Sequence, residues 1–233
     1  MIEEGASIID IGAASTRPGA KTVPVKEEVG RLVPVIRTIR QHFPDCIISA
    51  DTWRTAVAEE AIKAGADMIN DVGGGTLDTG MFALIGKQKI PYILMHMNGT
   101  PENMQENPLD KQALRIVSAW FSEKIKLLNQ AGCEQVLLDP GFGFGKTVDA
   151  NYQLLAGLRS LTDLGYPLVA GISRKSMINK VLGTKPENAL NGTTAANTIA
   201  LLNGATLLRV HDVKEAVEAV KIYAATRSAS EAG

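Results

Sequence analysis

The chain has 233 residues, a formal net charge of −1 at pH 7, and hydrophobic residues make up 45% of it. This length and composition fit one soluble α/β domain, although length alone would also permit two smaller ones. The near-neutral charge argues against a nucleic-acid-binding protein, which needs a basic face. Neither a membrane span of about 18 apolar residues nor a signal peptide is predicted.

A joint between helix and strand recurs along the chain. It consists of a glycine, a small residue and, shortly afterwards, an apolar run. The glycine suits the left-handed conformation that ends many helices. Repetition of such a joint predicts successive βα units. The glycines that begin it are Gly5, Gly65, Gly132 and Gly204.

Seven apolar runs are predicted to be strands. Most are continuously apolar rather than alternating, as in parallel strands that are covered on both faces. Their separations suit βαβ units of about 30 residues or more. The predicted strands are Ile8–Gly12, Cys46–Asp51, Met68–Val72, Tyr92–Met97, Val136–Pro140, Leu168–Ser173 and Leu207–Asp212.

Helices are predicted between these strands. Asp110–Ala131 has apolar residues at spacings of three and four, and Asp110 is its expected N-cap. Val213–Ala225 follows the same pattern. Pro34 is expected to kink or restart a helix over Val25–Phe43. Cys46 and Cys133 adjoin apolar runs and are expected to be buried free thiols of a cytoplasmic protein.

Polar residues end nearly every predicted strand. One or two could be structural ties, because an unpaired buried polar group costs about 2–7 kcal/mol. So many at carboxyl ends indicate the rim of a barrel active site, whereas an open doubly wound sheet, the alternative, would gather ligand groups at one switch point. We predict an α/β fold, a (β/α)8 TIM barrel over residues 1–226 with a polar tail at 227–233. The polar residues are Asp10, Asp51, Asn70, Asp71, His96, Asp139, Ser173, Arg209 and His211.

The opening residues Met1–Gly5 look like the last turn of a helix. Since seven of eight barrel strands are visible, we expect the first βα unit to be missing from this chain. Such a chain should keep much of its ligand pocket but turn over poorly, and it should leave two strand edges unpaired.

Three loops that follow predicted strands carry candidate binding groups. Residues 15–19 (Ser-Thr-Arg-Pro-Gly) can meet an anion, although an ordinary loop is equally consistent. Residues 139–147 are rich in glycine, but their register does not fit a phosphate-binding loop. A strand-end carboxylate beside glycines that let a flat ligand approach the backbone fits better. Residues 171–176 place two cations and two hydroxyls past a strand, or else mark a solvated helix start.

Two histidines allow more than one interpretation. Arg209 and His211 are two apart, so on an extended strand they face the same side and suit a shared anion. Alternatively, His211 pairs with Asp212. His96 lies between methionines, where core packing is a better interpretation than a metal site.

Two sets of rim residues suit two parts of one ligand. Carboxylates and amides can accept paired N–H bonds from a guanidine-like ring edge, and cations can bind an anion. A polar aromatic ring that bears a phosphate or diphosphate satisfies both sets. The first set is Asp51, Asn70 and Asp139, and the second is Arg17, Lys175, Arg209 and His211.

The chain resembles the dihydropteroate synthase family from Met1 to about Thr226, on motifs whose order and spacing together are specific. The resemblance implies a (β/α)8 barrel and a homodimer. It also implies an Mg²⁺-assisted transferase of folate biosynthesis that condenses 6-hydroxymethyl-7,8-dihydropterin diphosphate with 4-aminobenzoate. The motifs are IDIG at 9–12, STRPG at 15–19, SADT at 49–52, IND at 69–71, DPGFGF at 139–144, SRKS at 173–176 and RVHD at 209–212.

The resemblance also implies individual roles. The catalytic residues would be Arg17, Lys175, Arg209 and His211. Pterin binding would fall to Asp51, Asn70, Met95, Asp139, Phe144, Gly171 and Lys175. Diphosphate binding would fall to Thr16, Arg17, Arg209 and His211. Contacts to 4-aminobenzoate would come from Thr16, Pro18, Phe144 and Ser176.

Two departures from the family pattern stand out. Gly12-Ala13-Ala14 replaces the usual Gly-Gly-Glu, and the family's first strand and Asn-Val-Thr-Pro-Asp-Ser-Phe loop are absent. That loop supplies a metal-linked asparagine, so no metal ligand is expected in this chain. The alternatives are a methyltetrahydrofolate:corrinoid methyltransferase-like enzyme and a non-catalytic pterin-binding module. The expected partners are small molecules, without nucleic acid or membrane.

Overall fold

One parallel sheet forms the centre of the molecule. The computed structural model describes residues 1–15 and 23–231. Each strand pairs with its neighbours in the sequence, in the order β1-β2-β3-β4-β5-β6-β7, so the order never reverses. A doubly wound sheet would reverse it at a switch point. The strands are β1 (Ile8–Gly12), β2 (Ile47–Asp51), β3 (Met68–Asp71), β4 (Tyr92–Met95), β5 (Val136–Asp139), β6 (Leu168–Ala170) and β7 (Ala205–Leu208).

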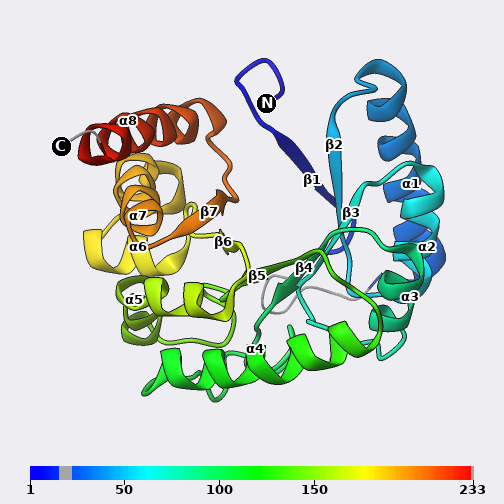
Figure 1. Ribbon diagram of the computed structural model, residues 1–233, viewed down its shortest axis with the longest axis horizontal. Coiled ribbons are helices and arrows are strands. Elements are labelled where there is room, and N and C mark those ends of the chain that lie inside the picture. The colour runs from blue at the N-terminus through cyan, green and yellow to red at the C-terminus, as the bar shows by residue number, and fades with distance from the viewer. Residues whose placement is uncertain (16–22, 232–233) are drawn as a thin grey trace.

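The helices lie outside the curved sheet, around its convex side (Figure 1). Strands inside and helices outside form the (β/α)-barrel architecture, which confirms the predicted fold class. The helices are α1 (Val25–His42), α2 (Thr55–Ala64), α3 (Met81–Gln88), α4 (Ala113–Gln130), α5 (Val148–Ala156), α6 (Ser176–Leu182), α7 (Leu190–Leu202) and α8 (Val213–Glu231), with short 3-10 helices at Leu158–Leu164 and Pro186–Asn188.

Apolar side chains fill two separate spaces. The larger cluster lies between the strands and the surrounding helices and includes Ile36, Leu94 and Phe121. A smaller cluster lies on the concave face of the sheet. It consists of Met68, Ile93 and Val169, with Ile8, Leu137 and Leu207 packed against them. This inner cluster covers the concave face below the carboxyl ends of the strands, where the sites of such barrels form.

The sheet has a seam where its first and last strands approach each other. Within residues 1–15 and 23–231, β1 pairs with β2 and β7 pairs with β6, and β1 and β7 are not hydrogen-bonded to each other. Figure 1 shows the open side between them. A groove of about 860 Å³ lies along this seam, between β1, β7 and α8.

Several elements differ from the sequence prediction, and helix α8, for example, continues to Glu231, into the predicted polar tail at 227–233. The predicted N-cap at Asp110 is wrong, because α4 begins only after Gln112, and the Asp110 carboxylate accepts a hydrogen bond from Thr147 Oγ1 at 2.9 Å. Helix α1 continues through Pro34 without a restart. Strand β7 ends at Leu208, so Arg209 and His211 lie in the following loop.

Candidate functional site

The two-residue period of a strand places a second layer above the apolar one. Side chains two residues apart face the same side, and Met68, Ile93 and Val169 already face the barrel interior. Two positions further along each strand, the chain reaches the carboxyl ends, where barrel sites form. The residues at these positions are Asp10, Asp51, Asn70, Met95, Asp139, Gly171 and Arg209. The structure therefore brings six of the residues predicted from the sequence into one layer, together with Asp10.

Arg209 is held by two carboxylates from the other side of the seam. Its Nε donates to Asp10 Oδ2 at 2.6 Å, and its Nη2 donates to Asp51 Oδ2 at 2.8 Å. Burial and the charge of Asp10 raise the pKa of Asp51 from 3.8 to about 7, against the opposing effect of Arg209. Burial disfavours the charge on Arg209, but the two carboxylates raise its pKa overall. These three residues form one charged cluster.

Two buried oxygens beside this cluster lack a hydrogen-bond partner within the part of the chain that the structure describes. They are Asp10 Oδ1 and Asn70 Oδ1. The amide nitrogen of Asn70 donates to Asp10 Oδ2 at 3.1 Å, which orients both side chains. Because buried polar atoms usually have partners, these oxygens are candidate acceptors for the N–H groups of a ligand.

Asp139 and Lys175 occupy the opposite side of the layer. Asp139 Oδ1 accepts from the Gly141 N–H at 2.7 Å. Lys175 Nζ donates to the Phe142 carbonyl oxygen and lies 4.8 Å from the ring centroid of Phe144. Burial lowers the pKa of Lys175 to about 8, opposed by the charge of Asp139. Burial likewise raises the pKa of Asp139, opposed by Lys175.

Gly171 lies between the two sides of the site. A side-chain carbon added there would meet Asp139 Oδ2 at 3.6 Å, Lys175 Nζ at 3.8 Å and Arg209 Cβ at 3.9 Å. The absence of a side chain at this residue therefore leaves a surface against which a flat ligand can lie, between a carboxylate and two cations.

The loops after β6 and β7 are joined by a hydroxyl. Ser173 Oγ lies 2.9 Å from Nδ1 of His211 and accepts from the His211 backbone N–H at 3.2 Å. Asp212 forms its ion pair with Arg174, at 2.6 Å. Ser173 therefore orients the His211 ring in the loop that follows β7.

The lysine of the glycine-rich loop was not predicted as a site residue. Lys146 is buried, and its Nζ donates to the carbonyl oxygens of His96, Gly141 and Phe144. All three N–H bonds of its ammonium group are therefore used. A phosphate-loop lysine would instead point toward a ligand, so the geometry supports the rejection of that motif. Its position after the loop was visible in the sequence, but not its partners.

His96 belongs to the packing around the barrel. Its ring lies edge-on to Trp120, with centroids 5.1 Å apart, and burial lowers its pKa to about 3. In residues 1–15 and 23–231, no group of three or more His, Cys, Asp or Glu side chains could hold a metal. The core interpretation of His96 is therefore supported.

The remaining predicted residues lie in different settings. Met95 is buried at the end of β4, and Ser176 is exposed at the first position of α6. Thr16, Arg17 and Pro18 lie outside the described residues.

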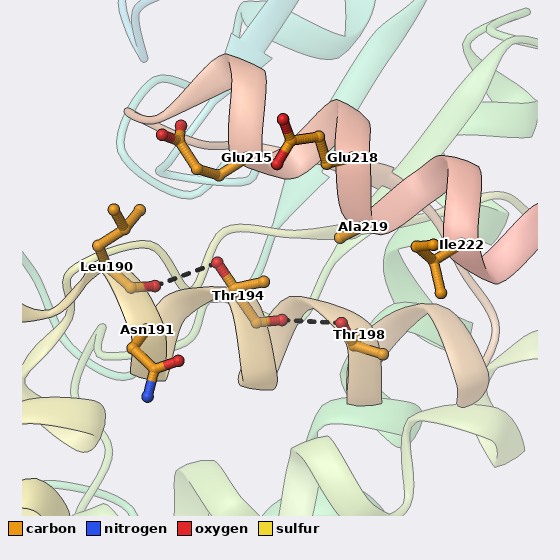
Figure 2. A pocket seen from close by; sticks show the side chains of 8 residues that line it. All are labelled: Leu190, Asn191, Thr194, Thr198, Glu215, Glu218, Ala219 and Ile222. Atoms are coloured by element: carbon orange, nitrogen blue, oxygen red, sulfur yellow. Dashed lines mark hydrogen bonds between the residues drawn. The ribbon is translucent and has the colours of Figure 1, made fainter.

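A second hollow, of about 490 Å³, lies on the outside of the barrel between α7 and α8 (Figure 2). Thr194, Thr198, Glu218 and Ile222 are among its lining residues. It contains none of the strand-end residues, so it is not the candidate active site. None of the helices in the described ranges is long and apolar enough to span a membrane.

Comparisons with known proteins agree with one another. A family model described as pterin binding enzyme matches residues 1–211. The dihydropteroate synthase of Escherichia coli K12 is 45% identical over 233 residues, which cover 99% of this chain and 82% of that protein. The Yersinia pestis dihydropteroate synthase, solved with a sulfonamide drug complex, has a TM-score of 0.93 at 44% identity, over 97% of this chain and 82% of that one. The Xanthomonas albilineans dihydropteroate synthase with 4-aminobenzoic acid has a TM-score of 0.90 at 40% identity, over 97% and 81%.

Proposed function

Because the chain belongs to the dihydropteroate synthase family of pterin-binding enzymes, we propose that its strand-end site condenses 6-hydroxymethyl-7,8-dihydropterin diphosphate with 4-aminobenzoate. The family acts in folate biosynthesis and is a family of transferases. The observation that carries the proposal is the layer around Gly171, where Asp139 lies on one side and Arg209 on the other. A ring with an attached anion matches this division.

The resemblance also assigns Asp51 to the pterin ring, but its carboxylate is paired with Arg209, so the proposed complex depends on three other side chains for ring binding. Asp139 accepts paired N–H bonds from the guanidine-like ring edge, since a carboxylate can accept two such bonds in parallel. Asn70 offers its unpartnered oxygen within the described chain. Lys175 lies beside Asp139 and over the Phe144 ring. In the proposed complex its ammonium group donates to acceptor atoms of the pterin ring.

Arg209 and His211 bind the diphosphate, with Arg17 of the sequence motif at 15–19. Arg209 already carries two carboxylate partners, so an arriving anion must share or replace them. Ser173 holds the His211 ring in the same region. In the complex these donors would lie close to where negative charge grows on the leaving group, and they would lower the barrier by stabilising that charge.

The proposed reaction needs no protein nucleophile. The bond between the pterin methylene carbon and the diphosphate oxygen breaks, and its electron pair leaves with diphosphate. The amine nitrogen of 4-aminobenzoate then bonds to the electron-poor carbon and loses a proton. Phe144 and Ser176 contact the benzoate in this scheme, with Thr16 and Pro18 of the motif at 15–19. A covalent adduct between chain and pterin, trapped during turnover, would contradict it.

Mg²⁺ is the proposed cofactor. Mg²⁺ commonly binds one or two carboxylates together with substrate phosphates and water. From the sequence, no metal ligand is expected in this chain, but one carboxylate, that of Asp10, fits this role, because its Oδ1 has no partner among residues 1–15 and 23–231. When bound, the ion would neutralise charge on the departing diphosphate.

We also propose that the molecule is a cytoplasmic homodimer. Both cysteines are free, which suits a reducing compartment. Large apolar side chains are exposed on α6, α7 and α8, and exposed apolar patches mark interfaces. They are Val181, Leu182, Ile199, Leu202 and Ile222. Sedimentation of the parent chain and of Ile222→Glu tests this: the variant should be monomeric, and a monomeric parent would overturn the proposal.

The central test measures binding and turnover on the same sample. Calorimetry with 6-hydroxymethylpterin should show binding, and incubation with the pterin diphosphate, 4-aminobenzoate and Mg²⁺ should produce dihydropteroate and free diphosphate. Ring binding without product would favour the pterin-binding module. Methyl transfer from methyltetrahydrofolate to a corrinoid would favour the methyltransferase. Neither binding nor turnover in a folded sample would overturn the proposal.

A further inference from the structure

Lys146 is a buried cation whose donors all contact backbone carbonyl groups. The residue is 5% exposed, and its Nζ lies 3.1 Å from the His96 carbonyl oxygen, 2.8 Å from that of Gly141 and 3.0 Å from that of Phe144. Burial lowers its pKa to about 7, and Asp139 opposes that shift. Since taking a charge out of water is costly, this arrangement calls for an explanation.

The three carbonyl groups belong to two different loops. His96 follows β4, whereas Gly141 and Phe144 follow β5. These loops touch closely, because a side-chain carbon on Gly141 would lie 1.9 Å from the His96 carbonyl oxygen, and one on Gly145 would lie 2.1 Å from that of Asn98. Lys146 therefore fastens the two loops at their closest approach.

The loop after β5, which Lys146 holds, orients the side chains of Asp139 and Lys175. The Gly141 N–H donates to the Asp139 carboxylate. The Phe142 carbonyl accepts from Lys175, and the Phe144 ring lies beneath the same ammonium. If the loop after β5 shifted, both Asp139 and Lys175 would lose contacts that set their positions.

We propose that Lys146 is a positioning residue for pterin recognition, which acts by holding the loop that orients Asp139 and Lys175. The proposal rests on the proposed function, since it assigns the oriented groups to the pterin ring. It assigns Lys146 no contact with either substrate. Its effect should therefore appear in ring binding and not in binding of the diphosphate.

Lys146→Met tests this, because methionine has a similar length and no donor. Titration with 6-hydroxymethylpterin should show an affinity loss of about tenfold or more, as expected when a charged hydrogen bond to the ring is misaligned. Affinity for inorganic diphosphate should change by less than about twofold on the same scale. Leu32→Ala, a buried change in α1, is the matched control: it should lower the melting temperature and leave both affinities unchanged.

A second variant covers a failure of Lys146→Met to fold. Lys146→Gln keeps two amide N–H donors for the three carbonyl groups, so its ring affinity should lie between those of the parent and the methionine variant. Folded variants with parental ring affinity would overturn the proposal, as would equal losses for ring and diphosphate. Failure of both variants to fold would assign Lys146 to the fold alone. Asp139→Ala distinguishes a failure of the Lys146 proposal from a failure of the proposed function, because unchanged ring affinity in that variant would refute the proposed function itself.

Discussion

The two sides of the candidate site are held in place by different means. On the ring side, backbone groups of the loop after β5 contact Asp139 and Lys175. On the anion side, Arg209 is held by two side chains, Asp10 and Asp51, which reach it across the seam between β7 and β1. The ring side is therefore preorganised by backbone contacts, whereas the anion side consists of ion pairs that can exchange partners.

This difference determines how each side of the site responds when its part of the substrate binds. Groups fixed by backbone contacts need little rearrangement when a flat ring arrives, so they favour binding. Arg209 must redistribute its hydrogen bonds when a diphosphate arrives, because its Nε and Nη2 already donate to Asp10 and Asp51. The anion side therefore responds to the ligand, and changes there should affect anion binding more than ring binding.

Removal of the central ring-side carboxylate should have the largest effect. Asp139→Ala deletes two charge-assisted hydrogen bonds to the ring, each worth about 1.5–3 kcal/mol, so pterin affinity should fall by about a hundredfold or more. Calorimetry with 6-hydroxymethylpterin measures this. Asp45→Ala, at an exposed loop carboxylate, is the control and should bind normally. Near-parental affinity in Asp139→Ala would remove the distinction between the two sides.

A smaller and more selective loss is expected on the anion side. Arg209→Met should weaken binding of the pterin diphosphate by about tenfold or more, because charged hydrogen bonds are lost, and binding of the bare ring by no more than about threefold. His211→Ala, like Arg209→Met, should weaken binding of the pterin diphosphate more than binding of the bare ring. Titrations with both ligands give the ratio, with the exposed Arg115→Met as the matched control. Equal losses for the two ligands would contradict the division.

Loss of one supporting hydroxyl should have a modest effect. Ser173→Ala removes the contact at 2.9 Å to the His211 ring, and one neutral hydrogen bond contributes about 1 kcal/mol. Diphosphate affinity should fall by about fivefold, by the conversion of tenfold for each 1.4 kcal/mol. Ring affinity should remain at the parental value. Ser173→Thr, which retains the hydroxyl, should restore diphosphate binding, and a failure to restore it would point to packing instead.

The last prediction concerns pH and stability. The pKa of Asp51 is 3.8 in its ordinary state and about 7 in the folded chain, so between these values the folded state binds more protons than the unfolded state. The contribution of Asp51 to stability therefore falls as pH rises through that range and stays reduced above about pH 7. Denaturant unfolding at several pH values should show this fall, and Asp51→Asn should flatten it. An equal slope in both chains would refute the assignment.

Much of the fold could be predicted because local signals agreed. The apolar runs and the glycine joints gave seven parallel strands, and polar residues at the strand ends gave the barrel. The boundaries were harder. Asp110 has the chemistry of an N-cap, but Thr147, far along the chain, donates to its carboxylate instead. Arg209 and His211 were expected on a strand, yet β7 ends before them.

The residue types of the candidate site could be predicted from the sequence. The residues that hold them in position could not. Asp51, Asn70 and Asp139 follow apolar runs, which a sequence displays directly. Lys146 could not be recognised in the same way, because one of its partners, His96, is 50 residues away and contributes only a backbone carbonyl group. Asp10 was visible as a strand-end carboxylate, but its pairing with Arg209 joins opposite ends of the chain.

That pairing has a consequence for folding kinetics. Asp10 and Arg209 are 199 residues apart in the sequence, and Asp51 and Arg209 are 158 apart. Contacts between such distant segments form only after most of the intervening chain is compact, since closing a long loop costs entropy before the contact is made. The ion pairs of Arg209 with Asp10 and Asp51 therefore form after the transition state for folding. Breaking it should accelerate unfolding and leave the refolding rate nearly unchanged.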